Sequence, residues 1–218
     1  MPIQRAQVDQ AAFNPAATLP YAMRFADLSI AMDDIYETLY SVNSGLIGRG
    51  LPRLEESLRG ANFTAFLSDL MVVAMARHAM GLAQNTWPNG HPDLLPTGRF
   101  PNDGALSAED GVEIKVTKRP TPAVDMHGAR GAWYCVFRYV VDNETQPLID
   151  RAPTRFTNVW LAQLGDGDFR NNPRQSALST RTSSPNRQGV AKLRQGWIYR
   201  EPQVAAEEAE ATAEAVGG

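Results

Sequence analysis

Three ionisable residues in the middle of the chain have the types and the spacing for metal-assisted hydrolysis. Asp93 follows Pro92, nineteen residues separate it from Glu113, and Lys115 lies two positions further on. Carboxylate oxygens are the ligands that Mg²⁺ prefers, so we expect Asp93 and Glu113 to bind this cation. The backbone carbonyl of Ile114 is available as a third ligand. Lys115 could steer or deprotonate the attacking water, or stabilise the charged phosphate.

The alternation of residue types around Glu113 predicts a strand that presents these groups on one face. Residues 112–117 alternate strictly between apolar and polar side chains, and successive side chains of a strand point to opposite faces. Glu113 and Lys115 therefore share a face. Placing a carboxylate and an ammonium on this face costs free energy unless the groups are solvated or have a function. The plainer interpretation is a solvent-facing strand with an ion pair worth ~0.2–1 kcal/mol.

The combination of Pro92-Asp93 with Glu113-Ile114-Lys115 resembles the PD-(D/E)XK signature of restriction-endonuclease-like nucleases. This resemblance implies an α/β (mixed α+β) fold, in which helices flank a central mixed β-sheet. It also implies hydrolysis of DNA phosphodiester bonds that depends on Mg²⁺, with Mn²⁺ as a substitute. By this resemblance Asp93 and Glu113 are metal ligands and Lys115 is the catalytic lysine.

Several residues remain open as further members of this site. Many members of the family add an acid from a helix, for which Asp69, Glu55 and Glu56 are candidates that the sequence does not separate. Asp103 is a rival for the first carboxylate, although Asn-Asp-Gly is typical of a turn.

The histidines and the cysteine have plainer interpretations. His91 and His127 are expected to be solvated loop residues, with a role as general base or DNA contact as the alternative. Cys135, in an apolar stretch, is expected to be a buried and inert thiol.

The elements that must position these residues can be predicted from periodicity. Apolar spacing predicts a helix from residue 20 to a stop at Asn43, a short helix over 54–58 that ends at Gly60, and a long helix over 62–83 capped by Asn62. Prolines and glycines exclude a helix over 86–104. Further expectations are strands at 112–117, 132–141, 156–164 and 196–199, and a short helix at 188–195.

This pattern predicts one compact domain. Residues 1–84 form an N-terminal helical region packed on the core, and residues 85–200 form the PD-(D/E)XK-like catalytic core. Residues 201–218 are an acidic tail that we expect to be disordered.

Positive charge is concentrated near the end of the core. The net charge of −3 would argue against nucleic acid, but the tail contributes five glutamates, and without it 21 basic residues face 19 acidic ones. Residues 169–200 contain seven basic residues and no acidic one, which suits contacts to DNA phosphates and bases. We expect segment 166–200 to contact DNA. The predicted contacts are Lys118, Arg119, Arg181, Arg187, Lys192 and Arg194.

Composition excludes several other classes of protein. One cysteine and three histidines argue against a disulfide scaffold and a zinc site. The longest apolar run is far shorter than a membrane span, and the first residues do not resemble a signal peptide. We therefore expect a cytoplasmic protein without membrane contact.

The sequence thus predicts a Mg²⁺-dependent endonuclease. The leading hypothesis is a type II restriction endonuclease that acts on double-stranded DNA as a homodimer. The alternatives are a repair nuclease or junction resolvase of the same fold, and a non-catalytic DNA-binding protein on a nuclease-like scaffold. An interaction protein unconnected with nucleic acid is a further alternative.

Overall fold

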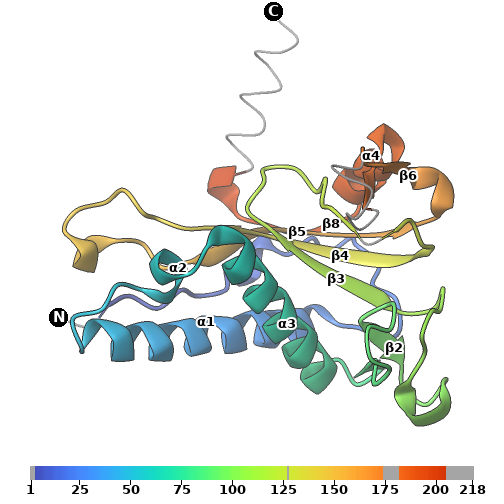
Figure 1. Cartoon of the computed structure of the whole chain (residues 1–218), viewed down its shortest axis with the longest axis horizontal. Helices are drawn as coiled ribbons and strands as arrows, with labels where there is room; N and C mark the ends of the chain where they lie inside the picture. Colours follow the sequence, from blue (N-terminus) through green and yellow to red (C-terminus); the bar gives the residue numbers. More distant parts are fainter. Residues whose placement is uncertain (1–2, 127, 174–181, 205–218) are drawn as a thin grey trace, which may run out of the picture.

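The computed structural model describes residues 3–126, 128–173 and 182–204 as a six-stranded sheet with helices on both faces (Figure 1). The helices are α1 (Phe25–Ile47), α2 (Leu54–Ser57), α3 (Gly60–His78) and α4 (Arg187–Gln195). The strands of this sheet, in spatial order, are β1 (Leu82–Gln84), β2 (Leu94–Pro96), β3 (Val112–Thr117), β4 (Ala132–Val140), β5 (Arg155–Leu164) and β8 (Trp197–Arg200). β3 and β4 run parallel, and the other neighbouring pairs are antiparallel. The protein is therefore a mixed α/β protein with a mostly antiparallel central sheet.

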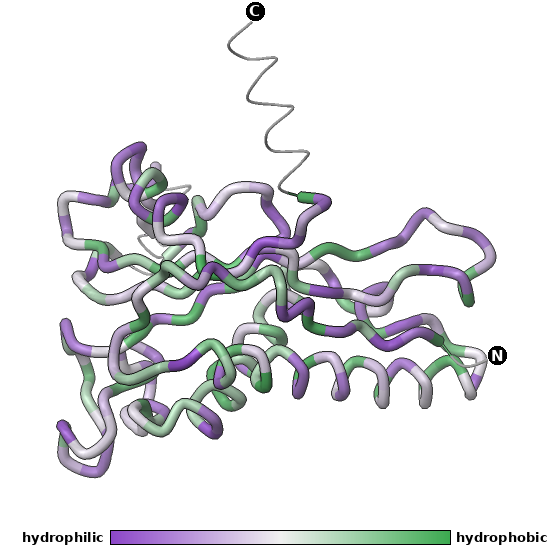
Figure 2. Tube along the Cα trace, turned by 180° about the vertical axis from the view of Figure 1, so that it is seen from behind, coloured by the Kyte–Doolittle hydropathy of each residue, from purple (hydrophilic) through white to green (hydrophobic). Residues whose placement is uncertain are grey.

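One face of the sheet is covered by the N-terminal helices. α3 lies against β3 and β1, and α1 packs on α3, so both helices lie below the sheet in Figure 1. Ile114 and Leu67 have no exposed surface in this layer. The hydroxyl of Tyr36 in α1 accepts a hydrogen bond from the backbone N–H of Phe156 at 2.9 Å, which joins α1 to β5. Along α1 the chain alternates between hydrophilic and hydrophobic residues (Figure 2), as expected for a helix with one buried stripe.

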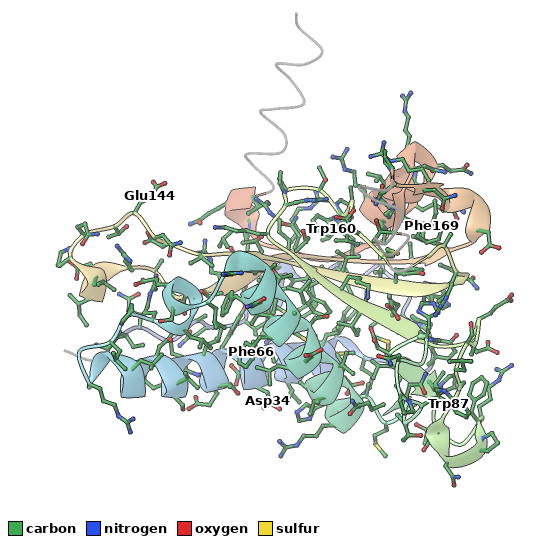
Figure 3. All side chains as sticks on the ribbon, viewed as in Figure 1. Asp34, Phe66, Trp87, Glu144, Trp160 and Phe169 are labelled. Atoms are coloured by element: carbon green, nitrogen blue, oxygen red, sulfur yellow. The ribbon has the colours of Figure 1, made fainter. Side chains whose placement is uncertain are left out.

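The opposite face is covered by α4 and by a small second sheet of β6 (Phe169–Asn171) and β7 (Ser183–Pro185). Leu193 of α4 is fully buried, in one cluster with Tyr134 and Trp160 of the main sheet. Figure 3 shows Trp160 and Phe169 on this side. Residues of β3 that alternate with Ile114 face this second layer, because side chains alternate along a strand.

The central elements agree with the sequence-based expectations. The strands predicted at 112–117, 132–141 and 156–164 are β3, β4 and β5, each within one residue of its predicted bounds. The short helix and the last strand are α4 and β8. Cys135 is fully buried, as expected for a strand with apolar residues on both faces.

The helix boundaries and the short strands differ from the expectations. Asn43 does not end α1: it is buried, and its side chain accepts a hydrogen bond from the N–H of Leu54 and donates one to Glu55. Asn62 does not cap α3, which begins two residues earlier at Gly60. The predicted helix over 62–83 ends at His78, and β1 follows. β1 and β2 were not predicted, because three residues are too few for a visible alternation.

The predicted division of the chain is only partly visible in the structure. Residues 1–84 include β1, which pairs with β2 of the segment 85–200, and one buried cluster joins α1 and α3 to the strands. Most of the predicted disordered tail, residues 205–218, lies outside the described residues.

Candidate functional site

The site begins where β2 separates from β3. The two strands share a single register pair, Leu94 with Val112, so the next residues in that antiparallel register are Asp93 and Glu113. Beyond this point, no strand among the described residues pairs with β3 on its β2 side. The backbone N–H of Ile114 therefore bonds to a side chain rather than to a strand: it donates to Asp93 Oδ2 at 2.8 Å.

The same separation brings the three predicted catalytic residues together. The backbone N–H of Asp93 donates to Glu113 Oε2 at 3.2 Å. The Lys115 ammonium forms an ion pair with Glu113 Oε1. Glu113 is only 8% exposed, so the plain interpretation of a solvent-facing ion pair does not describe it. A charged pair held away from water has to be fully partnered or functional.

The pKa values of the two carboxyl groups are shifted in opposite directions, because burial and repulsion dominate at Asp93 whereas His91 and Lys115 dominate at Glu113. Burial and the negative charge of Glu113 raise the pKa of Asp93 to about 6, against the attraction of Lys115. Burial alone would raise the pKa of Glu113, but the His91 hydrogen bond and the Lys115 charge together lower it to about 2. Burial disfavours the Lys115 ammonium, yet Glu113 and Asp93 leave the pKa of Lys115 above its usual value. Lys115 is therefore protonated at neutral pH.

His91 is a member of this site that the sequence analysis missed. It was expected to be a solvated loop residue, but it is 7% exposed and its Nδ1 lies 2.9 Å from Glu113 Oε2. Its Nε2 is buried and has no hydrogen-bond partner in the part of the chain that the structure describes. A buried N–H without an acceptor is costly, so the proton belongs on Nδ1, where it is donated to Glu113. The two-residue distance of His91 from Asp93 was no strand signal, because the chain bends at Pro92 and Asp93 before β2 begins.

The donor groups present fit a hard cation. Asp93, Glu113 and the carbonyl of Ile114 supply oxygen, and the Ile114 carbonyl lies on the side of β3 that β2 has left, because the N–H and C=O of one strand residue point the same way. Ser68 Oγ approaches that carbonyl at 3.5 Å. No group of three or more His, Cys, Asp or Glu side chains suited to a metal occurs among the described residues. A cation here would therefore rest on two carboxylates, the carbonyl and water, as Mg²⁺ commonly does.

The structure distinguishes between the candidate additional acids. Asp69 of α3 lines the same surface hollow as Asp93. Glu55 instead binds Asn43 and Thr154, and Glu56 pairs with Arg53 and Arg151. Asp69 is therefore the helix acid beside the site.

The rival first carboxylate, Asp103, accepts a hydrogen bond from the N–H of Gly98 at 2.8 Å. This hydrogen bond between Asp103 and Gly98 stabilises a turn, and it involves none of the residues around Glu113.

The predicted DNA-contacting residues fall into two groups. Lys192 pairs with Asp168 at 2.7 Å, and Arg119 lies 3.4 Å from Asp125, so neighbouring carboxylates offset their charges. Lys118 is exposed at the end of β3. Arg181 lies outside the described residues, as does His127.

The second group, Arg187 and Arg194, lies with Arg170, which was not among the predicted contacts; these three residues define an arginine cluster. These three exposed residues line one hollow beside α4, together with Asn186, and none of the described residues that line it is acidic. Their sheet face is the one that carries Glu113. Phe169, next to Arg170, packs edge-on against Tyr134 at 5.5 Å between ring centroids, and Tyr134 lies 6.2 Å from the His91 ring.

Comparison of the chain with protein-family models, with curated proteins and with solved structures found no match. Within the described residues, none of the helices has both the length and the apolar character needed to span a membrane.

Proposed function

We propose that the protein is a metal-dependent nuclease that hydrolyses DNA phosphodiester bonds at Asp93, Glu113 and Lys115. The observation that carries this proposal is the meeting of the buried Glu113 carboxylate with the partly buried Asp93 carboxylate and Lys115 ammonium at the point where β2 leaves β3. The cation, Mg²⁺ or Mn²⁺, would supply Lewis-acid stabilisation of the charge that develops on the phosphate. Asp93, Glu113 and the Ile114 carbonyl would hold it.

Lys115 acts in this proposal as a charge stabiliser. Its raised pKa keeps it protonated, so it is poorly suited to remove a proton from water. An ammonium fixed beside the reacting phosphate stabilises the extra negative charge of the transition state. Of the roles left open by the sequence, stabilisation of the phosphate is therefore the one we favour.

The arginine cluster supports DNA as the substrate. Three exposed guanidinium groups without a carboxylate among the lining residues of their hollow are suited to phosphate contacts, which arginine makes in a bidentate manner. Cutting both strands of a duplex with one site per chain would call for a homodimer. A restriction enzyme would give discrete bands from natural DNA, whereas a repair nuclease or resolvase would act on particular DNA structures.

The test is cleavage of plasmid DNA in Mg²⁺ and in EDTA, with Lys115→Ala and, as a matched control, Lys118→Ala. We expect cleavage by the wild type only in Mg²⁺. Lys115→Ala should reduce the rate at saturating DNA by about 100- to 1000-fold, as for the loss of one transition-state donor, while DNA binding in EDTA persists. Lys118→Ala should weaken binding and leave the saturated rate unchanged. Equal saturated rates for Lys115→Ala and wild type would rule out the proposed chemistry.

One observation favours a second candidate, a non-catalytic DNA-binding protein. Both carboxylate oxygens of Glu113 are engaged, one by Lys115 and the other by His91 and the Asp93 N–H. A cation must replace some of these partners, whereas a purely structural network would keep them all. In that case the wild type would bind DNA equally in Mg²⁺ and in EDTA and would cut in neither.

A further inference from the structure

A surface hollow begins at Asp93 and leads away from the reacting groups, between α3 and the loop after β1. Its lining includes Asp69 and Val73 of α3, Gln84 at the end of β1, and Trp87 of the loop. Trp87 is 51% exposed and Val73 is 52% exposed. Figure 3 shows Trp87 among the loops at the β2 end of the molecule. An apolar surface is thus presented to solvent directly beside a proposed metal ligand.

The position of Trp87 is fixed relative to Asp93 by the side chain and backbone of Asn85. The N–H of Trp87 donates to Asn85 Oδ1 at 3.0 Å, and Asn85 Nδ2 donates to the carbonyls of Pro92 at 2.9 Å and Ala105 at 2.8 Å. The backbone N–H of Asn85 donates to the carbonyl of Asp93 at 2.9 Å. The indole is therefore held on a preorganised loop, which lowers the entropic cost of binding a ligand against it.

The chemistry of the lining indicates a neutral, flat ligand with polar edges. Asp69 and Asp93 are acidic, and none of the lining residues that the structure describes is basic, so a free phosphate or another anion would be repelled. The indole of Trp87 offers a stacking surface, Val73 adds apolar contact, and Gln84 carries an amide that can both donate and accept. A nucleobase has a π-face and hydrogen-bonding edges that match these groups.

We propose that this hollow binds one unpaired nucleobase, stacked on Trp87, next to the phosphate that would lie at Asp93 and Glu113. The proposal rests on the nuclease function proposed above and names its substrate class. In a continuous duplex each base is already stacked and paired, so a base reaches Trp87 only from single-stranded DNA, a flap, an end or a flipped nucleotide. The hollow thus favours a nuclease that acts at unpaired DNA over one that cuts an undistorted duplex.

The test compares binding of a fluorescein-labelled single strand with binding of the same strand annealed to its complement, by fluorescence anisotropy in EDTA. The variants are Trp87→Ala, Trp87→Phe and, as a control of equal exposure elsewhere on the surface, Leu51→Ala, since Leu51 is 50% exposed. We expect Trp87→Ala to weaken binding of the single strand by about 5- to 150-fold, the range for loss of one stacked base. Trp87→Phe should recover most of this loss. Duplex binding and the Leu51→Ala variant should be unchanged.

Two results would overturn the stacking proposal. One is a Trp87→Ala variant that binds the single strand as tightly as the wild type. The other is an equal loss for single strand and duplex, which would indicate a general contact rather than an unpaired base. The thermal unfolding midpoint of Trp87→Ala should match the wild type, because half of the indole is already in solvent.

Failure of the nuclease proposal gives a different outcome. The wild type would then cut neither substrate in Mg²⁺, while selective binding of the single strand through Trp87 would persist and would support the base site by itself.

Discussion

Replacing Asp93 by Asn should make the protein more stable and inactive at the same time. The pKa of Asp93 is raised from 3.8 to about 6, first by burial and then by the charge of Glu113. Each pKa unit corresponds to about 1.4 kcal/mol, so ionised Asp93 costs the folded protein about 3 kcal/mol. An amide keeps an oxygen that can accept from the Ile114 N–H but carries no charge. The pKa of about 6 already includes the opposing attraction of Lys115, so we expect Asp93→Asn to be stabilised by up to about 3 kcal/mol above pH 7.

The pH dependence of this effect follows from the sign of the shift. Below about pH 4 Asp93 is protonated in the folded and in the unfolded chain, and it contributes nothing to the pH dependence. Between about pH 4 and 6 the folded state holds a proton that the unfolded state releases, so wild-type stability falls as the pH rises. The advantage of Asp93→Asn should therefore be small near pH 4 and complete above about pH 7. Urea unfolding at several pH values in EDTA, with the m-value as a check on two-state behaviour, measures it.

Glu113 provides a control of opposite sign. The Lys115 ion pair and the His91 hydrogen bond outweigh burial and lower its pKa to about 2, so its charge stabilises the fold above its unfolded pKa of about 4.5. Glu113→Gln should therefore destabilise the protein at neutral pH by about 3 kcal/mol. Added Mg²⁺ should stabilise the wild type but neither variant. If Asp93→Asn is less stable than the wild type at pH 8, or if its advantage does not change with pH, the reasoning about this carboxylate pair is wrong.

Three further predictions concern residues around the site and in the helical layer. His91→Asn should keep a donor for Glu113 and most of the activity. His91→Leu should lose about 1–3 kcal/mol of stability, measured by unfolding. It should also lose a larger share of metal affinity, measured by metal titration, than of DNA affinity. The double variant Arg187→Ala/Arg194→Ala should weaken DNA binding more at low salt than at high salt. It should reduce the slope of log K against log salt by about 2, as for two lost phosphate contacts. An unchanged slope would show that the arginine cluster does not contact DNA. Asn43→Ala should destabilise the protein by about 1–3 kcal/mol through the buried partners it leaves unpaired, with the saturated cleavage rate unchanged.

The central strands and the site residues on them could be predicted because their signals are local. Alternation over residues 112–117 fixes which side chains share a face, and the apolar stretch that becomes β4 indicates burial on both faces. The grouping of Glu113 with Lys115 follows from strand geometry alone. The alternation does not predict that Glu113 is buried, since Glu113 contacts His91 and Asp93 from a distant part of the chain.

The features that escaped prediction depend on contacts between distant parts of the chain. Asn43 has the residue type of a helix stop, but its amide is used to hold Glu55 and the start of α2, so α1 continues past it. His91 has the residue type of a solvated loop histidine, but its backbone is held by the carbonyl of Leu106 and the N–H of Ala108. Tertiary hydrogen bonds decided the outcome at both positions, and single-sequence patterns carry no record of them.

The arrangement of the site can be traced to the single register pair between β2 and β3. Leu94 opposite Val112 sets Asp93 opposite Glu113, the period of two along β3 adds Lys115, and the bend before β2 carries His91 to Glu113. Since a shift of one residue turns every side chain to the other face, this register matters more than the length of the loop that joins the strands. One residue inserted directly before Leu94 should therefore abolish the site. The same insertion at Gly98, in an exposed turn, should be tolerated, and the activities of the two insertions would show whether register or loop length controls this site.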